Sequence, residues 1–260
     1  MSKMASGAPP TDTTSFGFET IDAREKAPRV RAVFDRVANR YDLMNDLMSA
    51  GVHRIWKDIA IARANPQPGE TLIDAAGGTG DLARRFLRRA DEVQARRGGA
   101  DARAVVFDIN EEMLQAGRKR GADPRLAWVV GDAETPPFEP ASADVVTIAF
   151  GIRNVTRRDK ALAALRALLK PGGRFLCLEF SHVPPGPLAE LYDAFSFNII
   201  PQLGRIVAQD ADSYRYLVES IRKFPDALRF ESELRRAGFA QVSHTKLSGG
   251  VAALHTGWAV

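Results

Sequence analysis

Short apolar runs alternate with helical stretches along the middle of the chain. The runs at residues 71–74, 104–107, 126–130, 145–148 and 174–178 predict strands, and the stretches at 81–97, 111–120 and 160–169 predict helices. A helix between two parallel strands makes a right-handed crossover, and successive crossovers place helices on both faces of a sheet. The sequence therefore predicts an α/β fold with a doubly wound, mostly parallel sheet.

The flanking segments complete the predicted architecture. Apolar residues at helical spacing over residues 26–68 predict an N-terminal helical cap, whereas residues 1–25, rich in Ser, Thr, Gly and Pro, predict a flexible lead-in. We expect residues 69–260 to form a Rossmann-like core with a helical insertion at about 186–224. Two strand-like runs at 241–247 and 251–260, joined by Gly249 and Gly250, predict a terminal antiparallel hairpin and bring the sheet to seven strands.

Composition excludes several classes of protein. Apolar residues make up 45% of the chain and charged residues 26%, which is typical of a soluble globular protein and not of a disordered one. The longest stretch without a charged side chain, Leu247 to Val260, is shorter than the roughly 20 residues of a membrane-spanning helix. The single cysteine, Cys177, cannot form an internal disulfide and indicates a reducing compartment such as the cytoplasm.

A glycine-rich loop, DAAGGTG at residues 74–80, follows the first predicted strand and leads into a helix. Glycine lacks a Cβ atom, so Gly77, Gly78 and Gly80 let the backbone turn sharply and approach a ligand. Residues 78–83 also satisfy the dinucleotide pattern G-x-G-x-x-A. A nicotinamide-dependent dehydrogenase is therefore an alternative at this point.

Acidic residues near the strand ends favour a different ligand. Asp74 and Asp81 flank the loop, where they would repel a pyrophosphate but attract an ammonium or sulfonium group. Asp108 ends the second strand, where a carboxylate can accept two ribose hydroxyls. Asp132, after the third strand, can meet an adenine amino group. The set indicates S-adenosylmethionine, and the alternative is that each Asp caps a helix or turn.

Several longer segments resemble one enzyme family. They are RYDLMNDLMS (40–49), GVHRIWK (51–57), FGIRNV (150–155), RFLCLEFS (174–181) and DSYRYLVESI (212–221). These segments are similar to signatures of the ubiquinone/menaquinone-biosynthesis C-methyltransferases, which are class I S-adenosylmethionine-dependent enzymes. The resemblance covers nearly the whole chain, from Lys26 to Val260, and implies a single methyltransferase domain over residues 26–260.

The resemblance also implies a cofactor and a substrate. It places contacts to S-adenosylmethionine at Thr79, Asp108, Asp132 and Ala133. The implied substrate is a polyprenyl quinol, either 2-methoxy-6-polyprenyl-1,4-benzoquinol or demethylmenaquinol, which is methylated on a ring carbon. Many relatives carry Ser where this chain has Ala149, so one cofactor hydrogen bond, worth about 0.5–1.5 kcal/mol, is expected to be missing.

Ring methylation needs a phenolate, because loss of the hydroxyl proton pushes electron density onto the ring carbons. We expect Arg153 to stabilise the developing phenolate and Asn154 to orient its oxygen. Tyr41 and Asp42, on the helical cap, are candidate partners. For Arg153 the alternative is a surface ion pair. No metal is needed, and the four histidines show no metal-ligand spacing. Among them, His182 is the best candidate for a base.

A membrane-resident quinol and a chain without a spanning helix predict a cytoplasmic enzyme that is peripheral to the inner membrane. The apolar segment 188–200 is either core or a wall of a prenyl groove. The predicted helix 81–97 carries a stripe of arginines that either faces solvent or contacts anionic lipid. These arginines are Arg84, Arg85, Arg88 and Arg89. The expected partners are the quinol, the membrane surface or a quinone-biosynthesis complex, and a second copy in a homodimer.

Two further alternatives remain open from the sequence. The basic pI of about 9.4 allows a methyltransferase acting on RNA, protein or another small molecule. After the fourth strand, however, the chain reads AFGI at residues 149–152 instead of the Asn/Asp-Pro-Pro-Tyr motif of amino-methylating nucleic-acid enzymes, so no nucleic-acid partner is expected. The last alternative is a non-catalytic scaffold in a quinone-biosynthesis complex.

Overall fold

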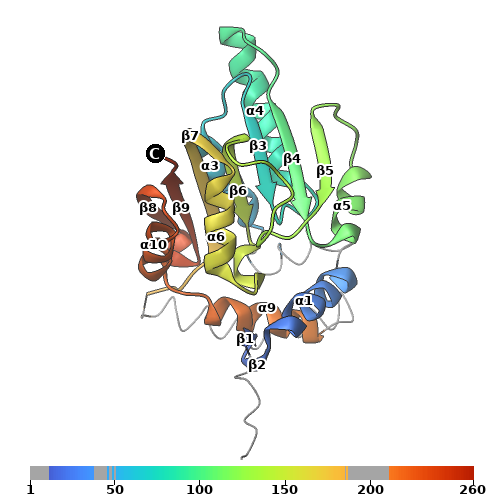
Figure 1. The fold of residues 1–260 in the computed structure, drawn as a ribbon, viewed down its shortest axis with the longest axis vertical. Coiled ribbons are helices and arrows are strands. Elements are labelled where there is room, and N and C mark those ends of the chain that lie inside the picture. Colours follow the sequence, from blue (N-terminus) through green and yellow to red (C-terminus); the bar gives the residue numbers. More distant parts are fainter. Residues whose placement is uncertain (1–11, 38–45, 47–48, 50, 185, 187–210) are drawn as a thin grey trace, which may run out of the picture.

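The computed structural model describes residues 12–37, 46, 49, 51–184, 186 and 211–260, which build a seven-stranded sheet in the order β5-β4-β3-β6-β7-β9-β8 (Figure 1). Its strands are β3 (Thr71–Ala75), β4 (Arg103–Asp108), β5 (Leu126–Val130), β6 (Ala143–Ala149), β7 (Leu169–Phe180), β8 (Ala240–Leu247) and β9 (Ala252–Trp258). Strands β5, β4, β3, β6 and β7 are parallel, and β9 runs antiparallel to both β7 and β8. The predicted doubly wound sheet with a terminal antiparallel hairpin is confirmed.

Helices connect and cover these strands. They are α1 (Ala23–Val37), α3 (His53–Ala64), α4 (Asp81–Arg97), α5 (Glu111–Arg118), α6 (Arg158–Ala167), α9 (Ala211–Lys223) and α10 (Ala227–Arg236). Helices α1 and α3 occupy the segment expected to be a helical cap, and α9 lies in the expected insertion. The rest of that insertion, with the apolar segment 188–200, lies outside the described residues.

Two apolar clusters hold the layers together, one on each face of the sheet. Alternation along a strand sends successive side chains to opposite faces, so Leu72 joins the first cluster and Ile73 the second. The first cluster includes Phe86 of α4, and the second includes Leu165 of α6 and Phe230 of α10. The central parallel strands β3 and β6 are therefore buried on both faces, as their continuous apolar runs require.

The N-terminal segment differs from the prediction. Within the expected lead-in, β1 (Thr13–Phe16) and β2 (Glu19–Asp22) form an antiparallel hairpin, and α1 follows immediately. The Phe16 ring stacks on Tyr216 of α9 with centroids 4.2 Å apart, and the Phe18 amide donates to Glu219 Oε2 over 3.1 Å. The prediction of a flexible segment fails for these residues because their order comes from tertiary contacts that composition does not reveal.

The hairpin belongs to a layer that lies across one end of the sheet. In Figure 1, α1 (blue), α9 (orange) and β1–β2 lie below the ends toward which the parallel strands point. Ligands of doubly wound sheets bind beyond these carboxyl ends. The layer of α1, α9 and the hairpin thus lies on the side of the sheet where a ligand is expected.

Candidate functional site

A pocket lies between the carboxyl ends of the strands and α1. It encloses about 780 Å³, including space open to solvent. Helix α1 contributes Ala27, Val30, Arg31 and Phe34, and the strand ends and following turns contribute Gly78, Asp108, Asn110, Asp132, Ala133, Phe150, Gly151 and Asn154. The structure thus brings together Gly78, Asp108, Asp132, Ala133 and Asn154 from the predicted site.

Asp108 is held in place by backbone amides at the end of β4. Its Oδ2 accepts from the Gly78 amide over 2.9 Å, and its Oδ1 accepts from the Asn110 amide over 2.8 Å. Burial raises the pKa of Asp108 to about 6, and these hydrogen bonds counteract the effect. Each carboxylate oxygen keeps a further lone pair, so Asp108 can accept the two hydroxyls of a ribose.

Gly77, Gly78 and Gly80 are each required at their position in the loop for a different structural reason. Gly78 has φ +53°, and a Cβ there would lie 2.9 Å from Met113 Cε. At Gly77 a Cβ would lie 2.7 Å from Asp74 Oδ2. Gly80, the residue before α4, has φ +71° and does not line the pocket, because it packs against Trp128. Gly80 therefore shapes the loop and is not placed to contact a ligand in this pocket.

A second, smaller pocket adjoins the first and shares Ala76 and Phe150 with it. Its lining includes the remaining predicted loop residues, Asp74, Gly77 and Thr79, together with Lys57, Asp81, Leu82 and Ala149. Asp74 is fully buried and accepts from Thr147 Oγ1 over 2.6 Å. Burial raises the pKa of Asp74 to about 7, although the Thr147 hydroxyl lowers it.

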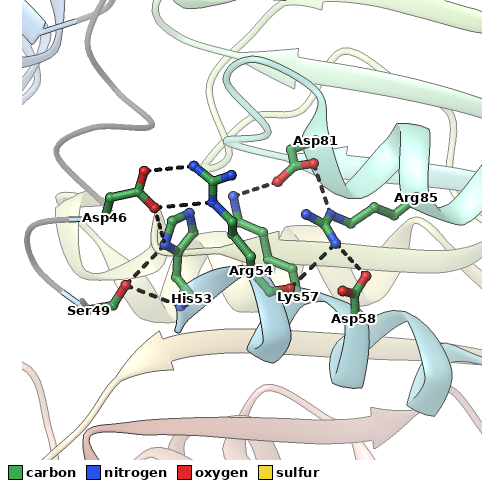
Figure 2. A network of polar contacts seen from close by, with 8 residues as sticks. All are labelled: Asp46, Ser49, His53, Arg54, Lys57, Asp58, Asp81 and Arg85. Atoms are coloured by element: carbon green, nitrogen blue, oxygen red, sulfur yellow. Dashed lines mark hydrogen bonds and ion pairs between the residues drawn. The ribbon is translucent and has the colours of Figure 1, made fainter. Parts of the chain in front are cut away.

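Lys57 of α3 brings a buried positive charge to this smaller pocket. Its Nζ lies 2.9 Å from Asp81 Oδ2, and Arg85 Nε lies 2.9 Å from Asp81 Oδ1 (Figure 2). Burial raises the pKa of Asp81, but Lys57 and Arg85 outweigh it and hold the value at about 2. Sequence reasoning did not single out Lys57, although this lysine ends the segment GVHRIWK (51–57) that resembles the family.

The same network continues to the start of α3. Asp46 pairs with Arg54 at 2.7 Å, and Ser49 Oγ accepts from the His53 amide over 3.1 Å and lies 3.0 Å from His53 Nδ1 (Figure 2). Burial, helped by the charge of Lys57, lowers the pKa of His53 to about 4. His53 is therefore neutral near pH 7 and stabilises the first turn of α3.

Arg153 does not line either pocket. Its side chain is 2% exposed and its Nη1 donates to Glu179 Oε1 over 2.7 Å and to the Phe150 carbonyl over 2.6 Å. The sequence had weighed a phenolate contact against a surface ion pair. The structure shows an ion pair, but a buried one, because its acidic partner lies on the adjacent strand β7. The third predicted catalytic residue, Tyr41, lies outside the described residues, as does Asp42.

With this geometry in place, comparison with known proteins decides the family. A match to the ubiE/COQ5 methyltransferase family covers residues 21–259. The chain belongs to this family. A relative from Caulobacter vibrioides strain NA1000, named ubiquinone/menaquinone biosynthesis C-methyltransferase UbiE, is 58% identical over 95% of this chain and 98% of its own length. The protein of the same name from Dinoroseobacter shibae is 52% identical, covering 95% and 96%.

Membership of the ubiE/COQ5 family agrees with likeness in fold. A S-adenosylmethionine-dependent methyltransferase from Aquifex aeolicus superimposes with a TM-score of 0.55 at 14% identity, covering 78% of this chain and 89% of that one. At this identity the likeness concerns the fold alone. It shows that the sheet order and terminal hairpin of this family member are those of class I methyltransferases.

In the part of the chain that the structure describes, no three His, Cys, Asp or Glu side chains are grouped to hold a metal ion. No described helix combines the length and apolar character needed to cross a bilayer. The Nε2 atom of His182, the candidate base, lies 2.7 Å from the Phe224 carbonyl oxygen. His182 lines neither of the two pockets.

Proposed function

We propose that this chain methylates a ring carbon of a polyprenyl quinol in ubiquinone or menaquinone biosynthesis, with S-adenosylmethionine as the methyl donor. One observation carries the proposal. In a ubiE/COQ5 family chain, the pocket that holds the carboxylate Asp108 at the end of β4 also holds Asn154 and the apolar side of α1. Polar groups for the cofactor and an amide with apolar walls for a quinol ring thus line one cavity.

The residues present fit S-adenosylmethionine. In our proposal Asp108 accepts the ribose hydroxyls, while Asp132 and Ala133 border the adenine. The smaller pocket suits the amino-acid end, because Asp74 can pair with its ammonium group and Lys57 with its carboxylate. Thr79 lies in the same pocket. When bound, the cofactor supplies an activated methyl group for transfer to carbon.

The protein's own task is to stabilise the phenolate and exclude water. Asn154 can donate a hydrogen bond to a quinol oxygen, which favours loss of the hydroxyl proton. Arg153 acts in our proposal as a positioning residue, since it binds the Phe150 carbonyl and Glu179 and so holds the turn that carries Asn154. The apolar residues of α1 keep the reacting carbon dry. Tyr41 stays a prediction from the sequence.

We also propose that the enzyme reaches its substrate at the cytoplasmic face of the inner membrane, alone, as a homodimer or within a quinone-biosynthesis complex. The argument is chemical, because a polyprenyl tail resides in the bilayer. The arginines of α4 give only weak support for a contact with anionic lipid, because three of them already bind groups within the protein. Arg84 donates to the Gly117 and Gly121 carbonyls, Arg85 binds Asp81, and Arg89 pairs with Glu92.

The test is a methylation assay with purified protein. The enzyme is incubated with S-adenosylmethionine and either demethylmenaquinol or 2-methoxy-6-polyprenyl-1,4-benzoquinol, and the product is analysed by mass spectrometry. We expect a ring-C-methylated product with one or both quinols. Tight binding of S-adenosylhomocysteine without turnover on any quinol would contradict the proposal, and quinone profiling of a deletion strain then names the accumulated intermediate.

A further inference from the structure

Tyr216 is the buried partner of Asn154. Its hydroxyl donates to Asn154 Oδ1 over 3.0 Å, and only 4% of Tyr216 is exposed. Asn154 ends the short 3-10 helix Ile152–Asn154 after β6 and lines the pocket that holds Asp108, whereas Tyr216 lies in the middle of α9. The hydrogen bond therefore ties a helix near the end of the chain to the wall of the candidate site.

This bond fixes which side of the Asn154 amide is free. A carboxamide carries its acceptor and its two N–H donors on opposite sides, so a bond at Oδ1 sets the direction of Nδ2. Among the described residues, no hydrogen-bond partner takes Asn154 Nδ2. An amide held by Tyr216 is therefore ready to donate to an oxygen atom bound in the pocket, and a flipped amide would present an acceptor instead.

The surroundings of Tyr216 leave its ring little freedom. Phe16 of the N-terminal hairpin stacks on it at 4.2 Å with an interplanar angle of 19°. The Arg29 guanidinium lies 5.7 Å from the Phe16 ring centroid, and Glu219, on the same helix as Tyr216, accepts from the Phe18 amide. Burial also raises the pKa of the Tyr216 hydroxyl above its ordinary range, so the group keeps its proton and remains a donor.

We propose that Tyr216 is a positioning residue that locks the Asn154 amide with Nδ2 toward the quinol oxygen that becomes the phenolate. The N-terminal hairpin supports this arrangement through Phe16. The inference rests on the proposed quinol methylation. It adds that the Tyr216 hydrogen bond makes Asn154 a hydrogen-bond donor, and not an acceptor, toward the substrate. A donor at that oxygen favours the ionised ring, whereas an acceptor would favour the neutral hydroxyl.

The test compares Tyr216→Phe with wild type, using full-length protein and the quinol that wild type methylates. The variant keeps the ring and its stacking on Phe16 but loses the hydroxyl. We expect kcat to fall about tenfold, the rising limb of the kcat–pH profile to move to higher pH, and the Kd of S-adenosylhomocysteine to stay within twofold. Tyr214→Phe removes another buried hydroxyl from α9 and should leave kcat within twofold.

A double-mutant cycle separates positioning from general support of the fold. If Tyr216 acts through Asn154, Tyr216→Phe should have no further effect on kcat in an Asn154→Ala background. Equal kcat in wild type and Tyr216→Phe, or losses that multiply in the double variant, would overturn the inference alone. Absence of turnover by wild type on every quinol would overturn the proposed function, and the inference with it.

Discussion

Arg153 and Glu179 form an ion pair with an Nη1–Oε1 distance of 2.7 Å, and their side chains are 2% and 1% exposed. The pair joins strand β7 to the turn after β6, and this turn also carries Asn154. Desolvation of two charges is costly, so such a pair adds little net stability, but the loss of one partner leaves the other charge buried alone. Replacement of either Arg153 or Glu179 should therefore destabilise the turn after β6.

Glu179→Gln should therefore destabilise the protein by about 3–5 kcal/mol, because the Arg153 charge stays buried without a compensating carboxylate. Urea denaturation followed by circular dichroism measures the change. The exposed pair Arg89–Glu92, with an N–O distance of 2.5 Å, supplies the control. Glu92→Gln should cost no more than about 1 kcal/mol. Equal losses in the two variants would contradict the buried-charge argument.

Gly80→Ala should destabilise the glycine loop more than its backbone conformation alone requires. Gly80 has φ +71°, in the left-handed region, and a Cβ on it would also lie 2.6 Å from Trp128 Cη2. We expect Gly80→Ala to cost about 2–4 kcal/mol in the wild-type background and about 1 kcal/mol in a Trp128→Ala background, where the clash is absent, from thermal unfolding. Equal losses in the two backgrounds would show that Trp128 has no part in the effect.

The site residues that could be predicted from the sequence are those placed at the site by their own strand or loop. Asp108 follows a predicted parallel strand and Gly78 lies in the glycine loop after another, and ligands of such sheets bind at the carboxyl ends of the strands. Arg153 could not, since the sequence does not reveal whether an arginine faces a ligand or a buried acid. Its partner Glu179 comes from the next strand of the sheet.

Residues from outside the strand–helix core were also hard to predict, because their contacts depend on how distant segments pack together. Lys57 reaches the loop through the packing of α3 on α4, and its place in the segment GVHRIWK does not by itself assign it to the cofactor. Tyr216 belongs to a segment that resembled the family, but its hydrogen bond to Asn154 depends on where α9 crosses the sheet edge. Phe16 lies in a segment whose composition predicts flexibility, although it stacks on Tyr216 from 200 residues away in sequence.

Lys57→Met should weaken binding of S-adenosylhomocysteine and spare a ligand that lacks the amino-acid end. A hydrogen bond to a charged group is worth about 1.5–3 kcal/mol, which corresponds to a loss of affinity of at least tenfold. We expect that loss for S-adenosylhomocysteine and less than a twofold change for 5′-methylthioadenosine, both measured by isothermal titration calorimetry. Arg85→Gln disturbs the same Asp81 carboxylate from outside the two pockets and serves as the control. Equal losses for the two ligands would exclude a carboxylate contact at Lys57.

The raised pKa of Asp74, about 7, predicts a pH-dependent stability of the unliganded protein. An unfolded aspartate ionises near pH 4, whereas the buried carboxyl stays protonated up to about pH 7. Between these values the unfolded state binds fewer protons than the native state, so the free energy of unfolding falls as pH rises and levels off above pH 7. Asp74→Asn should flatten this dependence, as measured by urea denaturation between pH 5 and pH 8. A dependence as steep in the variant as in wild type would assign it to other groups.

The same carboxyl should couple ligand binding to proton release. At pH 6.5 Asp74 is largely protonated in the free protein, and a ligand ammonium group beside it favours the ionised form. Binding of S-adenosylhomocysteine should therefore release a fraction of a proton at pH 6.5 and almost none at pH 8.5, and its affinity should increase between these values. Calorimetry in buffers of different ionisation enthalpy measures the release. Asp74→Asn should lose most of it, leaving the smaller part expected from Asp108, whose pKa is about 6. Proton uptake, or full release by the variant, would show that the ammonium group does not pair with Asp74.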